Sequence, residues 1–391
     1  MNPDIGWVYT IPYYLLLMVY GLIAAINLKS ERGSSLDRLT LLLCPVILFL
    51  FWGFRGYVAT DWRVYQVIFE DIGEIMESIS SGEEPPVEIG FCWLTYFIHA
   101  ISHSYLVFQV VLTALNIVLL HCLFKLFSPI PVISWVIWFA GFLLFHDLMR
   151  NVIALLICAI AFRFIVSREF VKYCICVLCA SIFHQSVLVF LPFYFLLRIR
   201  LPIWCYAVIL GISIIACLCG WSVFEWFVPV LEGINHNAQN YLHGQFETSF
   251  LDNRKYIFVL LPIAYFGCLV LKREKKNEVK FTIFYNCFIC FFLSLCWLTG
   301  NGEVQRRVSY LFMWSIPVLI PLILDRVEDS FGHMIVLLYV ALFCIHGCHR
   351  YNNMMWKYQN ALFTRLTPFE EREAEIENAN WAVGSAGQER K

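Results

Sequence analysis

The chain has 391 residues, of which 60% are hydrophobic and only 15% are charged, and its formal net charge is −1. A soluble globular protein carries about 25% charged residues, so this composition excludes an ordinary soluble domain. The net charge gives no argument for nucleic acid as a partner, and none is expected. Long apolar stretches recur along the chain, and a backbone in lipid must satisfy its hydrogen bonds within its own helix. The sequence therefore predicts an all-α, polytopic integral membrane protein.

Ten apolar stretches are predicted to cross the membrane as helices. They lie near residues 11–28, 39–54, 105–125, 131–146, 149–166, 203–222, 256–271, 281–299, 308–324 and 333–347. The first lacks the basic residues before it and the small-residue cleavage site that a signal peptide would have. Basic residues instead follow it, at Lys29 and Arg32. We therefore predict a retained first helix with the N-terminus outside.

The stretch 171–197 is long, and the polar residues His184, Gln185 and Ser186 interrupt it. Short loops rich in Lys and Arg are expected on the cytoplasmic side. A single crossing here would put the basic loop 272–280 outside, whereas two short helices that meet at His184 keep every basic loop inside. We predict this broken helix pair. Such a break is tolerated at membrane depth where the backbone lines a cavity.

The same topology places three connections outside, at 55–90, 223–254 and 300–307. Residues 349–391 follow the last helix as a polar, acidic tail that we expect to be partly disordered. Because every loop is short beside the membrane body, we predict one membrane domain, residues 1–348, followed by this tail.

Four arginines lie at the outer ends of predicted helices, against the inward bias of basic residues. They are Arg55, Arg150, Arg306 and Arg307. Arginine binds phosphate through two parallel hydrogen bonds and stays charged when buried. Several arginines at the lipid–water boundary would therefore suit a pyrophosphate headgroup. Taken singly, each could equally be a snorkelling anchor or the partner of a nearby carboxylate.

Two carboxylates of the first outer loop stand beside aromatic residues. The residues concerned are Asp61, Trp62, Tyr65, Glu88 and Phe91. A carboxylate in this setting can bind a sugar hydroxyl or take its proton as a general base. The alternative is loop capping or a salt bridge to Arg55. For His184, at the predicted helix break, the alternative to a functional role is a histidine whose hydrogen bonds are satisfied within the membrane core.

The 16 cysteines lie almost entirely inside apolar stretches, and two pairs, at 176/179 and 287/290, have C-x-x-C spacing. This spacing can indicate redox or metal chemistry, but cysteine within a membrane helix behaves as a small apolar side chain. We expect no metal site and no cofactor. The chain also contains no P-loop, no G-x-S-x-G and no H-E-x-x-H pattern.

The order of these motifs resembles the EpsG family, Wzy-type membrane proteins of bacterial exopolysaccharide and O-antigen clusters. The resemblance covers roughly residues 10–350 and includes the hydropathy profile. Four segments carry it: Arg55-x5-Asp61-Trp62-x2-Tyr65, Glu88-x-Gly90-Phe91, Arg150-Asn151-x2-Ala154 and Phe183-His184-Gln185-Ser186.

This resemblance implies a metal-independent glycosyltransferase, a polymerase on the outer face of the bacterial cytoplasmic (inner) membrane. Its substrate would be an oligosaccharide linked to polyprenyl pyrophosphate, such as undecaprenyl pyrophosphate. The glycan would be transferred to a sugar hydroxyl of another lipid-linked repeat unit. No nucleotide sugar is needed, because the pyrophosphate is the activated leaving group. The lipid bilayer, a flippase and a chain-length regulator are the other expected partners.

In such an enzyme we expect Arg150 and Arg307 to bind the pyrophosphate, with Arg306 beside them. Arg55 would support either the phosphate or the carboxylates. Asp61 or Glu88 would be the base, with Trp62 and Tyr65 in the sugar-binding region.

We expect His184 to orient the substrate from the membrane side.

Other classes of protein stay open. A flippase or transporter for the lipid-linked oligosaccharide should show an inverted repeat, and none is seen in this sequence. A membrane acyltransferase acting on the polysaccharide should carry its histidine in a stronger motif than that around His184. A non-catalytic scaffold would give no reason for outward arginines.

Overall fold

The computed structural model describes residues 7–222, 250–273, 279–298 and 302–388, and these residues form helices and connections without a strand. Six of the helices are long and apolar enough to cross a membrane. They are α1 (Ile11–Lys29), α2 (Ser35–Gly53), α6 (Tyr105–Phe127), α8 (Met149–Val166), α15 (Val279–Trp297) and α18 (Ser330–His349). The prediction of an all-α, polytopic membrane protein is confirmed.

The remaining predicted spans are also helical. They are α7 (Pro131–Phe142) with η2 (Leu143–His146), α11 (Ile203–Cys219), α14 (Phe250–Arg273), and α16 (Gly302–Met313) with α17 (Ile316–Leu324). The last two are bent by 42° at a short break and make a seventh crossing if counted as one span. Helices α7 with η2 and α11 are apolar but shorter than the six long ones. The structure thus supports fewer full-length crossings among its described residues than the ten predicted.

Local sequence signals set several helix ends. The Ser34 hydroxyl accepts a hydrogen bond from the backbone N–H of Asp37 at 3.1 Å and caps the start of α2. At the start of α18, Asp329 accepts from the N–H of Gly332 at 2.5 Å. Both contacts satisfy N–H groups that lack a partner within the helix. Helix α11 ends at Gly220, whose φ of 73° is the left-handed conformation that glycine adopts most readily.

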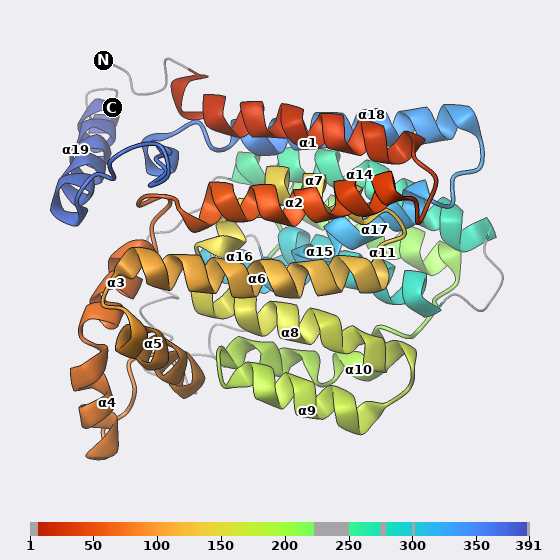
Figure 1. Ribbon diagram of the computed structural model, residues 1–391. Helices are drawn as coiled ribbons and strands as arrows, with labels where there is room; N and C mark the ends of the chain where they lie inside the picture. The colour runs from red at the N-terminus through yellow and green to blue at the C-terminus, as the bar shows by residue number, and fades with distance from the viewer. Residues whose placement is uncertain (1–6, 223–249, 274–278, 299–301, 389–391) are drawn as a thin grey trace.

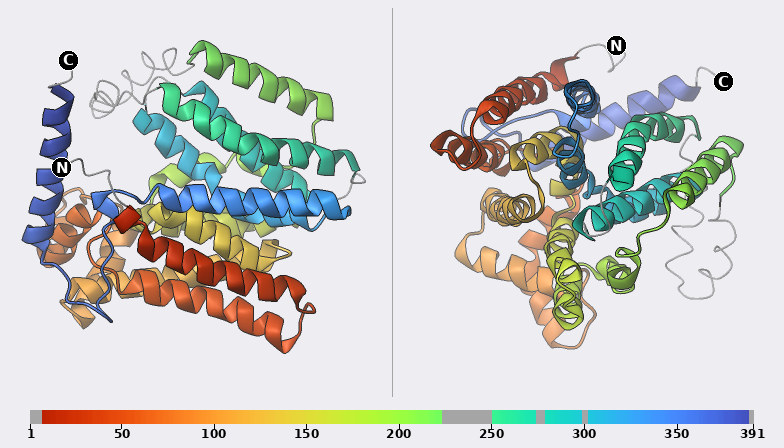
Figure 2. Two further views of the ribbon diagram at one scale, coloured as in Figure 1. Left: turned by 90° about the horizontal axis from the view of Figure 1, so that it is seen from above. Right: turned by 90° about the vertical axis from the view of Figure 1, so that its right-hand side faces the viewer.

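The long helices run side by side, and short helices gather at one end of the bundle, which we call the cap end (Figure 1). The cap end holds α3 (Trp62–Glu70), α4 (Ile72–Ser80), α5 (Ile89–Ile101) and α19 (Phe369–Gln388). Two further views show the same arrangement, with α19 across the end of the bundle (Figure 2). The loop between α1 and α2, which contains Arg32, lies at the opposite end (Figure 1). We call this opposite end the basic end.

The chain turns back on itself at His184, as predicted. Helix α9 (Phe170–Ser181) runs toward the cap end, and η3 (Gln185–Phe190) and α10 (Phe193–Leu196) return beside it (Figure 1). The Tyr173 hydroxyl donates to the carbonyl of Phe190 at 2.8 Å and joins the two arms. At the basic end Arg198 donates to the carbonyl of Ile165 at 2.6 Å. The hairpin therefore begins and ends at the same end of the bundle.

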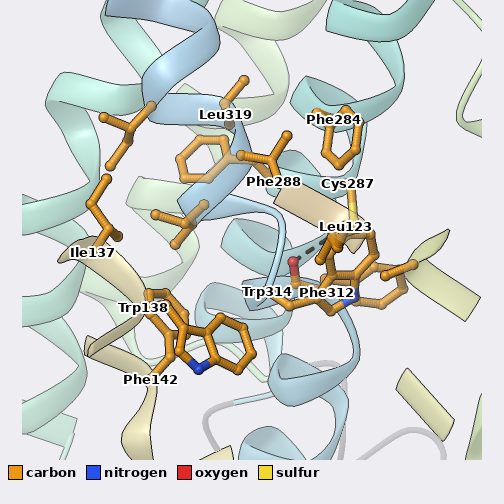
Figure 3. Close-up of a cluster of buried hydrophobic side chains, with 14 of the residues drawn as sticks. Leu123, Ile137, Trp138, Phe142, Phe284, Cys287, Phe288, Phe312, Trp314 and Leu319 are labelled. Carbon is orange, nitrogen blue, oxygen red and sulfur yellow. Dashed lines mark hydrogen bonds between the residues drawn. The ribbon is translucent and has the colours of Figure 1, made fainter. Parts of the chain in front are cut away.

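The core of the bundle draws on most of the long helices, and one part of it gathers large apolar side chains from α7, α15 and the bend between α16 and α17 (Figure 3). Trp314, beside the bend, packs edge-on against Phe162 of α8, with ring centroids 5.1 Å apart. A methyl group on Gly347 of α18 would lie 2.5 Å from the carbonyl oxygen of Ala140, so glycine permits this close crossing of α18 and α7. Close packing of this kind drives helix association in lipid, where the hydrophobic effect between helices is absent.

Two segments differ from the expectations. The predicted outer loop 55–90 contains α3 and α4, and its last residues begin α5, an apolar helix that was not among the predicted spans. After residue 348, where a partly disordered tail was predicted, the structure has η4 (Met354–Trp356) and α19. The physical reason is packing: Phe369 stacks edge-on with Trp62 at 5.1 Å, and Ile376 and Arg372 are buried.

Of the other predicted outer loops, residues 223–249 and 300–301 lie outside the described residues. The rest of these loops belongs to helices, with 250–254 in α14 and 302–307 in α16. The division into a membrane domain and a tail stays a prediction.

Candidate functional site

A cavity of about 370 Å³ lies at the cap end and is lined by four segments that are far apart in sequence. These segments are the loop before α3 together with the first turn of α3, the connection from η2 into α8, the hairpin break, and the middle of α16. The polar residues of its lining are Thr60, Asp61, Tyr65, Arg150, Asn151, His184, Ser186, Arg306, Arg307 and Tyr310. Six of the nine predicted site residues are thus brought to one cavity.

Glu88 links two of these segments. Its Oε2 pairs with the guanidinium of Arg150, at the start of α8. Its Oε1 lies 2.8 Å from Nδ1 of His184 and accepts from the backbone N–H of Gln185 at 3.2 Å. The Glu88 side chain is only 12% exposed, so these contacts replace most of its water. Burial favours the neutral acid, but the hydrogen bond with His184 and the charge of Arg150 outweigh it and lower the pKa of Glu88 to about 2.

The backbone next to Glu88 holds α5 against the hairpin. The N–H of Gly90 donates to the carbonyl of Ile182 at 3.0 Å. A methyl group on Gly90 would lie 2.4 Å from Cγ2 of Ile182 and 2.9 Å from its carbonyl oxygen. Only a residue without a side chain fits this approach, so Gly90 explains how Glu88 comes close to His184.

A second, more open groove of about 870 Å³ is lined by both members of the Glu88–Arg150 pair. Arg150 lines both spaces, and the polar groups of the groove also include Glu84, Ser181 and Gln185. Arg150 is therefore the charged side chain that the cavity and the groove share.

Asp61 stands at the N-terminus of α3, and a strained turn places it there. Ala59, two residues before it, has a φ of 68°, which is uncommon for a residue other than glycine. The backbone N–H groups of Thr60 and Asp61 both donate to Oδ2 of Asp147, each at 3.0 Å. Asp147 is completely buried. A second carboxylate therefore lies directly behind the one that lines the cavity.

Arg306 and Arg307 approach the cavity from α16, and both side chains are exposed. With Arg150 they make three cations on one lining, and two of them come from a helix more than 150 residues away in sequence. Tyr65, on α3, completes the wall near Asp61 and is 6% exposed. Burial and the charge of Asp61 raise the pKa of Tyr65, so its hydroxyl stays a hydrogen-bond donor at neutral pH.

Three predicted site residues do not line the cavity: Glu88 lines the groove instead, and Arg55 and Trp62 line neither space. Arg55 is 1% exposed, lies over the ring of Trp52 at 4.6 Å and donates to the carbonyl of that residue at 3.0 Å. Trp62 is also 1% exposed and donates to the carbonyl of Ala59 at 3.2 Å. Trp62 therefore supports the turn that carries Asp61, whereas the Arg55 side chain is held against the last turn of α2. Direct contact with a ligand in the cavity would require them to move.

Asp147 was missed as a candidate because the sequence shows it only as one acid in a short connection. Among the polar residues that do line the cavity, Asn151 and Ser186 stood in the predicted motif segments without an assigned role, and Tyr310 was missed, because uncharged polar residues at helix ends are common. The sequence signal that could have found Asp147 is its place three residues before Arg150, at the outer end of a helix. Among the residues that the structure describes, no three His, Cys, Asp or Glu side chains gather closely enough to hold a metal ion.

The cavity lining suits phosphate binding combined with proton transfer. Three arginines can bind a doubly charged phosphate group without a metal ion. A carboxylate and an imidazole on the same lining can accept or donate a proton. The cavity is also large enough to admit a phosphate with part of a sugar, since ligand pockets are commonly about 300 Å³ or larger.

No curated protein and no solved structure matches the chain. The model of the EpsG family matches residues 38–360, a range that contains every lining residue of the cavity and of the groove.

Proposed function

The chain belongs to the EpsG family, and from this membership and the cavity at the cap end we propose that it is a polysaccharide polymerase. The enzyme transfers a glycan from polyprenyl pyrophosphate to a sugar hydroxyl of another lipid-linked repeat unit. The observation that carries the proposal is the cavity lined by Arg150, Arg306 and Arg307 together with Asp61 and His184.

The donor pyrophosphate binds to the three arginines. Arginine offers paired N–H donors that match phosphate oxygens, and its charge stabilises the negative charge that develops on the leaving group. Neutralisation by arginine explains why no metal ion is expected. Arg150 is held in place by Glu88, so its guanidinium is already oriented before the substrate arrives.

Asp61 takes the proton from the acceptor hydroxyl. The hydroxyl oxygen attacks the anomeric carbon of the donor, the bond from that carbon to the pyrophosphate oxygen breaks, and polyprenyl pyrophosphate leaves with the electron pair. Carboxylate bases act in this way in inverting glycoside hydrolysis. Glu88 is less suited, because Arg150 and His184 engage both of its oxygens and it is a very weak base.

His184 positions the substrate beside Asp61. Its Nδ1 faces Glu88, so the opposite nitrogen of the ring is available to the cavity. The same pairing of an imidazole with a carboxylate orients catalytic histidines elsewhere, and this makes His184 the alternative base. Asp61→Asn and His184→Gln separate the two roles. If Asp61→Asn keeps most of the activity while His184→Gln loses it, the base is His184.

The cap end faces the outside of the cytoplasmic membrane in this proposal. The basic loops gather at the opposite end of the bundle, and such loops stay in the cytoplasm. The N-terminus of α1 is then outside. The flippase would deliver lipid-linked units to this side, and the chain-length regulator would act on the growing polymer.

The test is reconstitution of the purified protein with an oligosaccharide linked to polyprenyl pyrophosphate, with EDTA present. We expect a ladder of products that differ by one repeat unit, together with released polyprenyl pyrophosphate. Movement of intact substrate across the membrane without a ladder would support a transporter instead. Attachment of acyl groups without chain growth would support an acyltransferase.

A further inference from the structure

Asp147 lies in the short connection between η2 and α8, and its side chain is completely buried behind the cavity. Its Oδ2 accepts hydrogen bonds from the N–H groups of Thr60 and Asp61, both at 3.0 Å. These two N–H groups belong to the turn that carries the proposed base. Asp147 therefore determines where the backbone of Asp61 stands.

The second oxygen of Asp147 has a different environment. Oδ1 is buried and has no hydrogen-bond partner among the described residues, and the same holds for Nε of Arg55 and the hydroxyl of Tyr105. Four charged or titratable groups interact electrostatically with Asp147. They are Arg55 at the end of α2, Asp61, Tyr65 on α3 and Tyr105 on α6. Its neighbour His146 accepts a hydrogen bond from Trp138 at 3.0 Å.

These surroundings make the charge of Asp147 sensitive to pH near neutrality. Burial raises the pKa of the Asp147 carboxyl to about 7, and the negative charge of Asp61 adds to this effect. The two backbone N–H groups and the cation of Arg55 act in the opposite direction. Asp147 thus changes from the neutral acid to the carboxylate as the pH rises through the neutral range.

We propose that Asp147 is a positioning residue for Asp61, which holds the turn through Oδ2 and makes Asp61 a stronger base when Asp147 is charged. The inference rests on the proposed function, in which Asp61 accepts the proton of the acceptor hydroxyl. An ordinary aspartate is a weak base at neutral pH, and a like charge nearby favours its protonated form. In the transfer step the proton moves from the hydroxyl to Asp61, and Asp147 neither gains nor loses one.

The pH dependence of a single round of transfer tests this inference. For the wild-type protein we expect the rate to rise roughly three- to tenfold between pH 6 and pH 8, because charging Asp147 strengthens the base. Asp147→Asn keeps an oxygen for the two N–H groups but carries no charge. It should keep the rate that the wild type has at pH 6, without the rise, and the KM of the lipid-linked substrate should not change. Asp147→Ala removes the hydrogen-bond acceptor as well and should be slower than Asp147→Asn at every pH.

Two results would overturn the inference that Asp147 controls the basicity of Asp61. A rise that persists in folded Asp147→Asn overturns the inference, and so does a wild-type rate that does not rise between pH 6 and pH 8. If Asp147→Asn does not fold, as judged by size-exclusion chromatography in detergent, Asp147→Glu replaces it. This variant displaces the turn but keeps a charge, so a lower rate that still rises supports the inference, and a lost rise overturns it. Absence of polymer from the wild type at every pH contradicts the proposed function instead.

Discussion

Both ends of the bundle carry arginines, but the groups that these arginines contact are different. At the basic end, Arg198 and Arg200 donate to backbone carbonyls in the last turns of α8 and α14, at 2.6 and 2.5 Å. At the cap end, Arg150 pairs with a carboxylate, and Arg306 and Arg307 line a cavity with it. The first arrangement satisfies the carbonyls that every helix end leaves without a partner.

The position of an arginine at a helix end therefore does not reveal its role. A cation that caps a helix is satisfied by the fold itself. A cation held beside a cavity by a carboxylate is oriented toward whatever enters the cavity. The two kinds of arginine should therefore respond differently to the same substitution.

The largest expected effect is that of Arg150→Ala on polymer formation. The substitution removes a phosphate donor from the cavity and leaves Glu88 without its cation, so we expect the rate to fall by about 100-fold or more. Gel ladders from the reconstituted reaction measure the rate. The matched control is Arg198→Ala at the basic end, for which we expect a change of about twofold or less, since this arginine only caps a helix. Equal losses in both variants would remove the distinction between the two ends.

The next effect is on stability at the cap end. Arg372 of α19 is 2% exposed and donates to the carbonyls of Tyr57 and Met354, at 3.1 and 2.6 Å. Arg372→Ala leaves these carbonyls without their donor, and we expect the free energy of unfolding to fall by about 2–3 kcal/mol. Thermal melting in detergent measures this change. Arg365→Ala, in the connection before α19, is the control, and unchanged melting of both variants would contradict a structural role for the tail.

A smaller effect is expected where α5 meets the hairpin. Gly90→Ala places a methyl group 2.4 Å from Cγ2 of Ile182 and forces the two segments apart. We expect about 1–3 kcal/mol of destabilisation from this overpacking, and a loss of activity because Glu88 moves away from His184. Gly73→Ala, in α4, is the control, since its methyl group meets no atom within 4 Å. It should leave stability unchanged or raise it slightly.

The last expected effect concerns the ionisation of Glu88, and it changes with pH only in acid. Its pKa is lowered in the fold to about 2, so its charge stabilises the protein above the ordinary pKa of a glutamate, near 4.3. This contribution is lost as the pH falls toward 2. We expect the difference in melting temperature between the wild type and Glu88→Gln to be constant from pH 5 to pH 8 and to shrink below pH 4. A gap that widens in acid would show that the pair does not stabilise the charged form.

The pattern of apolar stretches was enough to predict most of the helices. The bias of basic residues predicted the hairpin at His184, because a single crossing would have reversed every later loop. Two helices were not predicted, because the length of an apolar stretch is a poor guide to short or polar helices. Helix α5 is too short for an ordinary span, and α19 is polar, so its order depends on contacts such as the one between Phe369 and Trp62.

For the candidate site, the sequence alone determined which residue types stand at the outer helix ends, since charge in an apolar chain is conspicuous. Only the tertiary structure decided which of them share a cavity. It separated Arg150, Arg306 and Arg307 from Arg55, and it placed Asp147 behind Asp61. The physical reason is that side-chain burial and contacts between distant segments depend on how helices pack. Hydropathy reports only that a segment lies in the membrane, and it does not report which face of the segment meets its neighbours.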